Sequence, residues 1–153
     1  LSGADHILIV GVGTSEPIVN NAYNLFMRLG LNCRAQTDSY MQLMEVALLR
    51  PGDLVVGISQ SGSSVDPVLT LKQAKQNGVS TICITGNTQS PITEYADVTL
   101  LSVAREARAE AIASRLAQDT IIDALYVILA WQNIEVAIEN EKHIWDALLP
   151  KML

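Results

Sequence analysis

Short runs of apolar and β-branched residues alternate in this chain with longer segments that have the spacing of helices. The runs lie at residues 6–11, 32–37, 54–59, 81–85 and 98–101, and no hairpin dipeptide joins any two of them. Strands that are apolar throughout and separated by helices are typical of a parallel sheet covered on both faces. Because crossovers between parallel strands are right-handed, we predict an α/β fold of flavodoxin-like or Rossmann-like topology: a three-layer αβα sandwich with a five-stranded parallel sheet.

The segments between and after these runs predict the helices. They lie at residues 17–29, 39–50 and 65–77, followed by a short helix from Pro91 and a long helical region from about Glu110, with a break between Asn140 and His143. With 153 residues and no repeat or linker, the chain is predicted to be one domain, residues 1–153. It begins with leucine and its first strand follows almost at once, so we expect a domain cut from a longer protein.

Composition and charge exclude several classes of protein. Hydrophobic residues make up 49% of the chain and charged residues 17%, which suits a compact fold rather than a disordered segment. The net charge is −6, and lysine and arginine form no cluster. Because neutralised phosphates supply most of the affinity for nucleic acids, we do not expect these residues to bind DNA.

The two cysteines and the most apolar segment bear on the cellular compartment. Cys33 and Cys83 are 50 positions apart without a CxxC pair or a neighbouring histidine, so we expect two buried free thiols and no metal site. Residues 121–131 are apolar but include Asp123, and they fall short of the roughly 20 residues that span a membrane. No targeting signal is visible, so we predict a cytoplasmic protein without membrane contact.

The turn after the first run, Gly11-Val-Gly-Thr-Ser-Glu-Pro17, resembles the start of a dinucleotide-binding fingerprint. Glu16 stands where the third glycine should be, so the evidence for a nucleotide is weak, and we predict no cofactor. Thr14 and Ser15 remain as two hydroxyl groups just before a proline that suits the first turn of a helix. Taken alone, Ser15 is explained as the N-cap of that helix.

The loop after the third run carries a stronger signal. Residues 59–64, Ser-Gln-Ser-Gly-Ser-Ser, place four hydroxyl groups and a glycine between a buried strand and a helix that begins near Val65. Gly62 lets the backbone approach a ligand closely, and the helix N-terminus offers unpaired N–H groups and the positive end of its dipole. One serine would cap the helix, so four exceed that need. The loop therefore predicts a phosphate site that requires no lysine.

A Ser-x-Ser-Gly-x-Ser pattern after a buried strand, with a Gly-x-Gly-Thr-Ser turn one unit earlier, resembles the sugar isomerase (SIS) family of phosphosugar isomerases and regulators. Residues 78–82, 85–91 and 95–97 resemble that family's fourth-strand region, so the match covers nearly the whole chain. The resemblance implies one phosphosugar-binding set from the two loops: Gly13, Thr14, Ser15, Ser59, Gln60, Ser61, Gly62 and Ser64.

Within this set, the resemblance implies that Ser59, Ser61 and Ser64 bind the phosphate and that Gln60 adds an amide. The first turn would contact the sugar or the phosphate through Ser15 and its neighbours. The family more often has threonine where this chain has Ser64, and the hydroxyl group is kept.

The helical region near the C-terminus narrows the resemblance. Residues 113–118 and 121–125 resemble the helix that closes the SIS domain of RpiR-type bacterial transcription regulators, and residues 30–32, 37–38 and 50–53 are similar to that family too. In those regulators an N-terminal helix-turn-helix domain binds DNA and the SIS domain senses a sugar phosphate. The resemblance implies a sugar-phosphate-sensing effector domain, with DNA bound only by a domain outside this chain. The sugar, and the sign of the response to it, stay open.

A phosphosugar isomerase or lyase is the alternative function, and a small-molecule-binding scaffold is a third. An isomerase needs a base near the sugar carbons, and the best candidate is Glu110, which lies near where some SIS isomerases place a catalytic glutamate. An acid in the first turn of a helix more often complements the helix dipole, so we expect no catalytic residue. His6 fits a histidine beside the core, and His143 fits a solvated face.

The C-terminal region predicts self-association. Residues 121–131 are apolar on nearly every face of a helix, and such a helix has to be buried all round. Further apolar side chains follow at Ile134, Ile138, Trp145 and Leu148. We expect a homodimer or higher oligomer through these helices; the alternative is a tail that folds back over its own core. Arg115 is a candidate ligand or interface residue, whereas Arg105 and Arg108 alternate with acids as on a solvated surface.

Overall fold

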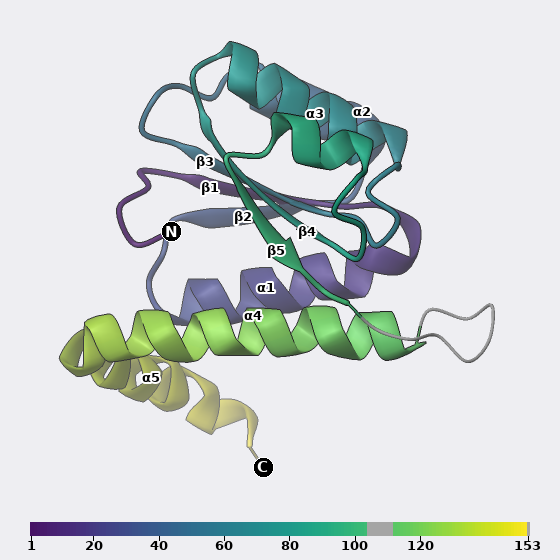
Figure 1. Ribbon diagram of the computed structural model, residues 1–153. Coiled ribbons are helices and arrows are strands. Elements are labelled where there is room, and N and C mark those ends of the chain that lie inside the picture. The colour runs from purple at the N-terminus through teal and green to yellow at the C-terminus, as the bar shows by residue number, and fades with distance from the viewer. Residues whose placement is uncertain (104–111, 153) are drawn as a thin grey trace.

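The computed structural model describes residues 1–103 and 112–152, and within them it places a five-stranded sheet (Figure 1). The strands are β1 (Ile7–Val10), β2 (Cys33–Gln36), β3 (Leu54–Ile58), β4 (Ser80–Thr85) and β5 (Val98–Leu101). They run parallel to one another in the order β2-β1-β3-β4-β5. This is the flavodoxin-like order, and it confirms the predicted parallel sheet.

Helices cover both faces of the sheet (Figure 1). On one face lie α1 (Glu16–Arg28) and α4 (Ile112–Gln132), which pack against each other. On the other face lie α2 (Ser39–Val46), α3 (Val65–Gln76) and the 3-10 helix η2 (Pro91–Tyr95). The remaining helical elements are η1 (Gly13–Ser15), α5 (Ile134–Leu148) and η3 (Leu149–Lys151). The predicted three-layer αβα sandwich is confirmed.

The sheet divides the core into two parts, because successive side chains of a strand point to opposite faces. Toward α1 and α4, Ile9 packs in a cluster with Phe26 and Ile122. Toward α2 and α3, Leu8 packs in a second cluster with Leu71. β1 and β3 are buried along their whole length, which explains why both appear in the sequence as continuous apolar runs.

Two helical predictions were wrong in their bounds. α2 begins as expected, with Asp38 Oδ1 accepting the N–H of Met41 at 2.9 Å, but it ends at Val46 rather than near residue 50. The C-terminal break lies at Asn133, where φ is −146°, and not between residues 140 and 143. Around those residues α5 is held against α1, where Glu141 accepts hydrogen bonds from Arg28.

The order of the strands reverses between β1 and β3. The chain runs from β1 outward to β2 and returns to β3 on the other side of β1. The turn after β1 and the loop after β3 therefore leave neighbouring strands at the same carboxyl edge, on the right of Figure 1. In open α/β sheets, ligands bind in the crevice at this switch point.

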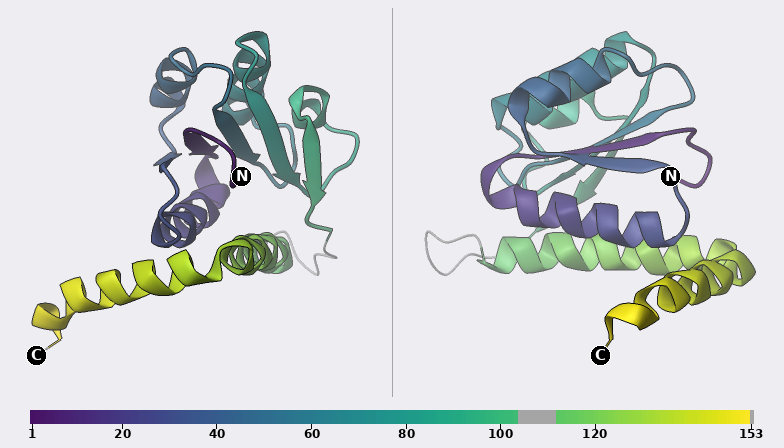
Figure 2. Two further views of the ribbon diagram at one scale, coloured as in Figure 1. Left: turned by 90° about the vertical axis from the view of Figure 1, so that its left-hand side faces the viewer. Right: turned by 180° about the vertical axis from the view of Figure 1, so that it is seen from behind.

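α5 lies outside the sandwich. It follows α4 at a bend of 111°, has no buried residue, contacts α1 and α4, and carries the C-terminus away from the sheet (Figure 2). Within the described ranges no single helix has the length and apolar composition needed to cross a membrane. Only α4 and the segment that follows it, counted together, have that length and composition. Of the two cysteines, Cys83 is buried as expected, but Cys33 is only partly buried because β2 is an edge strand.

Candidate functional site

The loop after β3 holds its serine side chains by bonds within the loop. Ser59, which is 1% exposed, donates its hydroxyl to Ser64 Oγ at 3.1 Å. Ser64 is the N-cap residue of α3 by backbone position, but its side chain makes no capping hydrogen bond. Ser61 Oγ accepts the N–H of Ser63 at 3.2 Å. The hydroxyl groups of Ser59 and Ser64 therefore bond to each other, and the serine at the cap position is not used to cap the helix.

Gly62 is required in this loop for a reason that the sequence did not suggest. Its φ is +66°, a conformation that favours glycine. A Cβ atom at this position would lie 2.5 Å from Ser90 Cβ and 2.9 Å from Thr85 Oγ1. Close approach to a ligand was the predicted role, but the structure shows a close approach to the loop after β4. Gly62 therefore allows the loop of residues 59–64, called the serine loop below, to pack directly against the loop after β4.

The turn after β1 is built differently. Gly13 has φ +59°, and its N–H donates to Glu16 Oε1 at 3.0 Å. Ser15 is buried, occupies the N-cap position of α1 and makes no side-chain capping bond. The simple explanation of Ser15 as a capping residue is therefore wrong. Thr14 is exposed beside it.

Glu16 explains why this turn does not suit a nucleotide. In a dinucleotide site the pyrophosphate lies on the amides that open the first helix. Here a carboxylate already accepts the N–H of Gly13 from within the turn. A second anion at this amide would meet the charge of Glu16, so the acid disfavours a pyrophosphate at the position where a glycine would admit it.

Gln60 points out of the serine loop toward α4. Its Oε1 accepts hydrogen bonds from Ser102 Oγ and from Gln118 Nε2, both at 3.0 Å. Both donors are 1% exposed. The amide nitrogen of Gln60 lies against Gly86, where a Cβ atom would collide with it. Sequence reasoning missed Ser102 and Gln118, because nothing in their local sequence indicates that they meet at this loop.

A second buried glutamine positions the turn after β1. Gln42 on α2 is fully buried, and its Nε2 donates to the carbonyl oxygens of Gly11 and Gln36, both at 3.1 Å. Its Oε1 accepts the Thr70 hydroxyl at 3.4 Å. These bonds connect the end of β1 with α2 and α3. The sequence signal that could have revealed Gln42 is its position four residues before Val46, which places both side chains on the same side of a short helix.

Of the other candidate residues, some lie outside the described part of the chain and some lie away from the two loops. Glu110, Arg105 and Arg108 lie outside the described residues. His6 precedes β1 and so lies at the opposite, amino edge of the sheet, while His143 is exposed on α5. Among the described residues, no group of His, Cys, Asp or Glu side chains is placed to hold a metal ion.

Arg115 lies on the exposed side of α4, within a hollow between the N-terminal ends of α1 and α4. Pro17 and Asp119 line the same hollow. A polar contact joins the two helices beside this hollow: Asn21 on α1 donates to Asp119 Oδ1 on α4 at 3.0 Å. Arg115 is thus beside the first turn rather than on the serine loop, which leaves its role as a ligand or interface residue a prediction.

The family of the chain follows from its sequence as a whole. The sequence model of the SIS domain matches residues 1–128. The chain belongs to the SIS domain family. This match includes both loops and most of α4, and it leaves α5 outside.

Curated relatives of this SIS domain include transcription regulators. The chain is 35% identical over 131 residues to the HTH-type transcriptional regulator RpiR of Escherichia coli K12, covering 84% of this chain and 44% of that protein. The chain spans about half the length of the curated relatives it matches. The predicted likeness to RpiR-type regulators is confirmed.

Two solved structures share the fold. The sugar isomerase domain of an RpiR transcription factor from Sphaerobacter thermophilus aligns with a TM-score of 0.87 and 26% identity, over 94% of this chain and 79% of that one. The NanR protein of Vibrio vulnificus, in complex with ManNAc-6P, aligns with a TM-score of 0.92 and 21% identity, over 99% of this chain and 58% of that one.

Proposed function

We propose that this SIS domain is the sugar-phosphate-sensing effector domain of an RpiR-type transcription regulator. The observation that carries the proposal is the serine loop at the switch point, where Ser59 and Ser64 bond to each other instead of capping α3. A phosphate can replace that bond with its own oxygen atoms and can also use the N-terminus of α3. The family of the chain, its regulator relatives and the NanR complex with ManNAc-6P support it.

In this proposal the phosphate lies on Ser59, Ser61 and Ser64, with Gly62 fixing the loop. The sugar extends toward Gly13, Thr14 and Ser15, which follow β1 at the same edge of the sheet. The exposed Thr14 and the buried Ser15 offer neutral hydroxyl groups there, which suit sugar hydroxyls.

DNA binding would belong to a part of the protein outside residues 1–153, which form one phosphosugar-binding domain. The chain has a net charge of −6, which opposes contact with nucleic acid phosphates. A regulator of this kind works in the cytoplasm. A gel shift at physiological salt would show no sequence-dependent complex with this chain alone, and such a complex would contradict the division of labour.

The function is tested by a thermal-shift screen against sugar phosphates and their unphosphorylated counterparts. A ligand at 100 times its Kd stabilises a protein by about 2.7 kcal/mol, so a true ligand raises the melting temperature clearly. We expect phosphorylated sugars alone to do so. A screen in which no sugar phosphate raises the melting temperature would contradict the proposal.

The alternative of an isomerase or lyase keeps one candidate base, Glu110. Removing a general base typically lowers a rate by about 10²–10⁴-fold, so a site without one turns over near background. We expect NMR spectra of the best-stabilising sugar phosphate to stay unchanged on incubation with the chain. Conversion of the sugar phosphate at an enzymatic rate, and loss of that conversion in Glu110→Gln, would show that the domain is an enzyme and not a sensor.

We also propose a homodimer through α5. Four exposed apolar side chains lie along α5 and at the start of η3, which follows it directly: Ile134, Ile138, Trp145 and Leu149. Their spacings of 4, 7 and 4 residues read the same in both directions, so two antiparallel copies place Ile134 opposite Leu149 and Ile138 opposite Trp145.

The mass of the protein in solution tests this dimer. Light scattering should give twice the chain mass, and Ile138→Glu should give the single mass, with Tyr40→Glu on α2 as the matched exposed control. A concentration-independent single mass for the unaltered chain would contradict the dimer.

A further inference from the structure

Gln60 connects the serine loop to α4 through its side-chain amide. Its neighbours in the sequence, Ser59 and Ser61, belong to the proposed phosphate site, but its own side chain leaves that site. Oε1 accepts from Gln118 Nε2 on α4 and from Ser102 Oγ after β5, each at 3.0 Å. The backbone of Gln60 is held too, because its carbonyl accepts the N–H of Gly86 at 3.0 Å.

Gln118 makes this link obligatory for α4. The described buried side chains of α4 are Ser114, Gln118 and Ile122, spaced four residues apart on one stripe. Ile122, the last of these three residues, belongs to the apolar core cluster between α1, α4 and the sheet. A buried amide that loses its partner is costly, so Gln118 keeps its bond as long as α4 keeps its place. The amide of Gln60 therefore fixes where the N-terminal half of α4 lies relative to the serine loop.

We propose that Gln60 is the positioning residue that couples occupancy of the serine loop to the position of α4, and through α4 to α5. The inference rests on the proposed function, because it needs a ligand on Ser59 and Ser61. A phosphate that takes these hydroxyls replaces the bond from Ser59 to Ser64 and the bond from the Ser63 N–H to Ser61 Oγ, which hold the loop on either side of Gln60. Because Gln60 holds Gln118, the bound and free loops favour different positions of α4.

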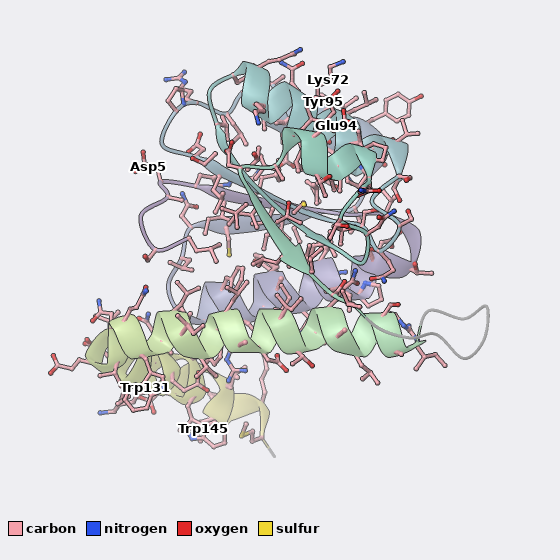
Figure 3. All side chains as sticks on the ribbon, viewed as in Figure 1. Asp5, Lys72, Glu94, Tyr95, Trp131 and Trp145 are labelled. Carbon is pink, nitrogen blue, oxygen red and sulfur yellow. The ribbon has the colours of Figure 1, made fainter. Side chains whose placement is uncertain are left out.

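The chain carries its own reporter of this coupling. Both of its tryptophans lie on the C-terminal helices, Trp131 near the end of α4 and Trp145 on α5 (Figure 3). They are 72% and 53% exposed, and neither lies in the two loops. Tryptophan fluorescence therefore reports on α4 and α5, while the melting temperature reports on ligand binding.

The test compares Gln118→Met with Ser102→Ala in the 153-residue chain. Each variant removes one donor to Gln60 Oε1 and leaves the other, but only Gln118 belongs to α4. ManNAc-6P is the first probe, followed by the other sugar phosphates of the thermal-shift screen, each at saturating concentration. We expect the unaltered chain and Ser102→Ala to change their fluorescence on binding. In Gln118→Met we expect the amplitude to fall by more than half, while the Kd changes by less than about tenfold, within the usual range of coupling between sites.

Equal amplitudes in Gln118→Met and the unaltered chain would overturn the inference while leaving ligand binding intact. Should Gln118→Met not fold, Gln118→Asn keeps the amide but shortens its reach, and the same loss is expected. A ligand-independent measurement uses Gln60→Met, Gln118→Met and the double variant. If the two side chains act as one link, the double variant melts within about one degree of the weaker single variant, and additive shifts would overturn the link.

Discussion

The two loops that flank the switch point differ in what satisfies their polar groups. In the loop after β3, the Ser59 hydroxyl donates to the Ser64 hydroxyl, and Ser61 Oγ accepts a backbone N–H, so the bonds are neutral. In the turn after β1, the N–H of Gly13 is bonded to a carboxylate, that of Glu16. The two loops come from neighbouring strands and share an edge, but they present opposite conditions to an incoming anion.

This difference indicates which loop binds each end of a ligand. Exchanging neutral hydroxyl bonds for charge-assisted bonds to a phosphate is favourable, because such bonds are roughly twice as strong as neutral ones. A phosphate at the turn after β1 would have to displace or approach the Glu16 carboxylate. The phosphate is therefore assigned to the serine loop, and the neutral sugar to the turn.

The glycines of the two loops give the largest contrast. Gly62 and Gly13 both have positive φ, but a Cβ atom would collide with Ser90 at the first and meet open space at the second. We expect Gly62→Ala to destabilise the domain by about 3 kcal/mol and to abolish binding, because strain and overpacking add. Gly13→Ala should cost only about 1 kcal/mol, from the backbone alone.

Urea unfolding of both variants measures this pair. Equal losses of stability would show that the packing of the serine loop against Ser90 has no energetic weight, and the contrast between the loops would lose its structural basis.

The hydroxyl groups give the next contrast. A hydrogen bond to a charged group is worth about 1.5–3 kcal/mol, so Ser61→Ala should weaken sugar-phosphate binding at least about tenfold. Thr14→Val removes a hydroxyl of similar exposure from the other loop, where we place the sugar. We expect a smaller loss there, of about two- to twelvefold, since a neutral hydrogen bond contributes roughly 0.5–1.5 kcal/mol. Calorimetric titrations measure both, and a reversed order would exchange the two ends of the ligand.

Glu16→Gln sharpens the comparison by removing the charge and keeping the shape. The neutral amide oxygen can still accept from Gly13, so the turn should persist. We expect the affinity for inorganic phosphate to rise by about two- to fivefold, because an exposed charge pair contributes roughly 0.2–1 kcal/mol. Unchanged or weaker phosphate binding would show that Glu16 does not bias the anion toward the serine loop.

Acid stability involves the opposite edge of the sheet. The backbone N–H of Thr81 donates to Asp97, its hydroxyl donates too, and Lys75 lies nearby, which together lower the pKa of the Asp97 carboxyl. Because the folded pKa lies below the unfolded one, this contribution is full above about pH 4 and is lost as the pH falls through the folded pKa. Melting curves of Asp97→Asn should depend less on pH below about 4 than those of the unaltered chain. An unchanged acid profile would contradict this.

The strands, the layers and the serine loop could be predicted because each depends on local sequence. Buried parallel strands appear as apolar runs, and four serines exceed what one helix cap needs. The bonds from Gln42 to Gly11 and from Gln118 to Gln60 could not be predicted, since the two residues of each pair are 31 and 58 positions apart. The break at Asn133 was missed because the polar residues that suggested a later break, around Glu141, are bonded to α1 instead.

The central claim is that the loop after β3 recognises the phosphate of a phosphorylated sugar. The most direct test is calorimetric titration of the chain with the sugar phosphate that stabilises it most and with the same sugar lacking the phosphate. We predict saturable binding of the phosphorylated sugar, weakened at least about tenfold by Ser61→Ala, and no measurable heat from its unphosphorylated counterpart. Equal affinity for the two sugars would contradict the claim.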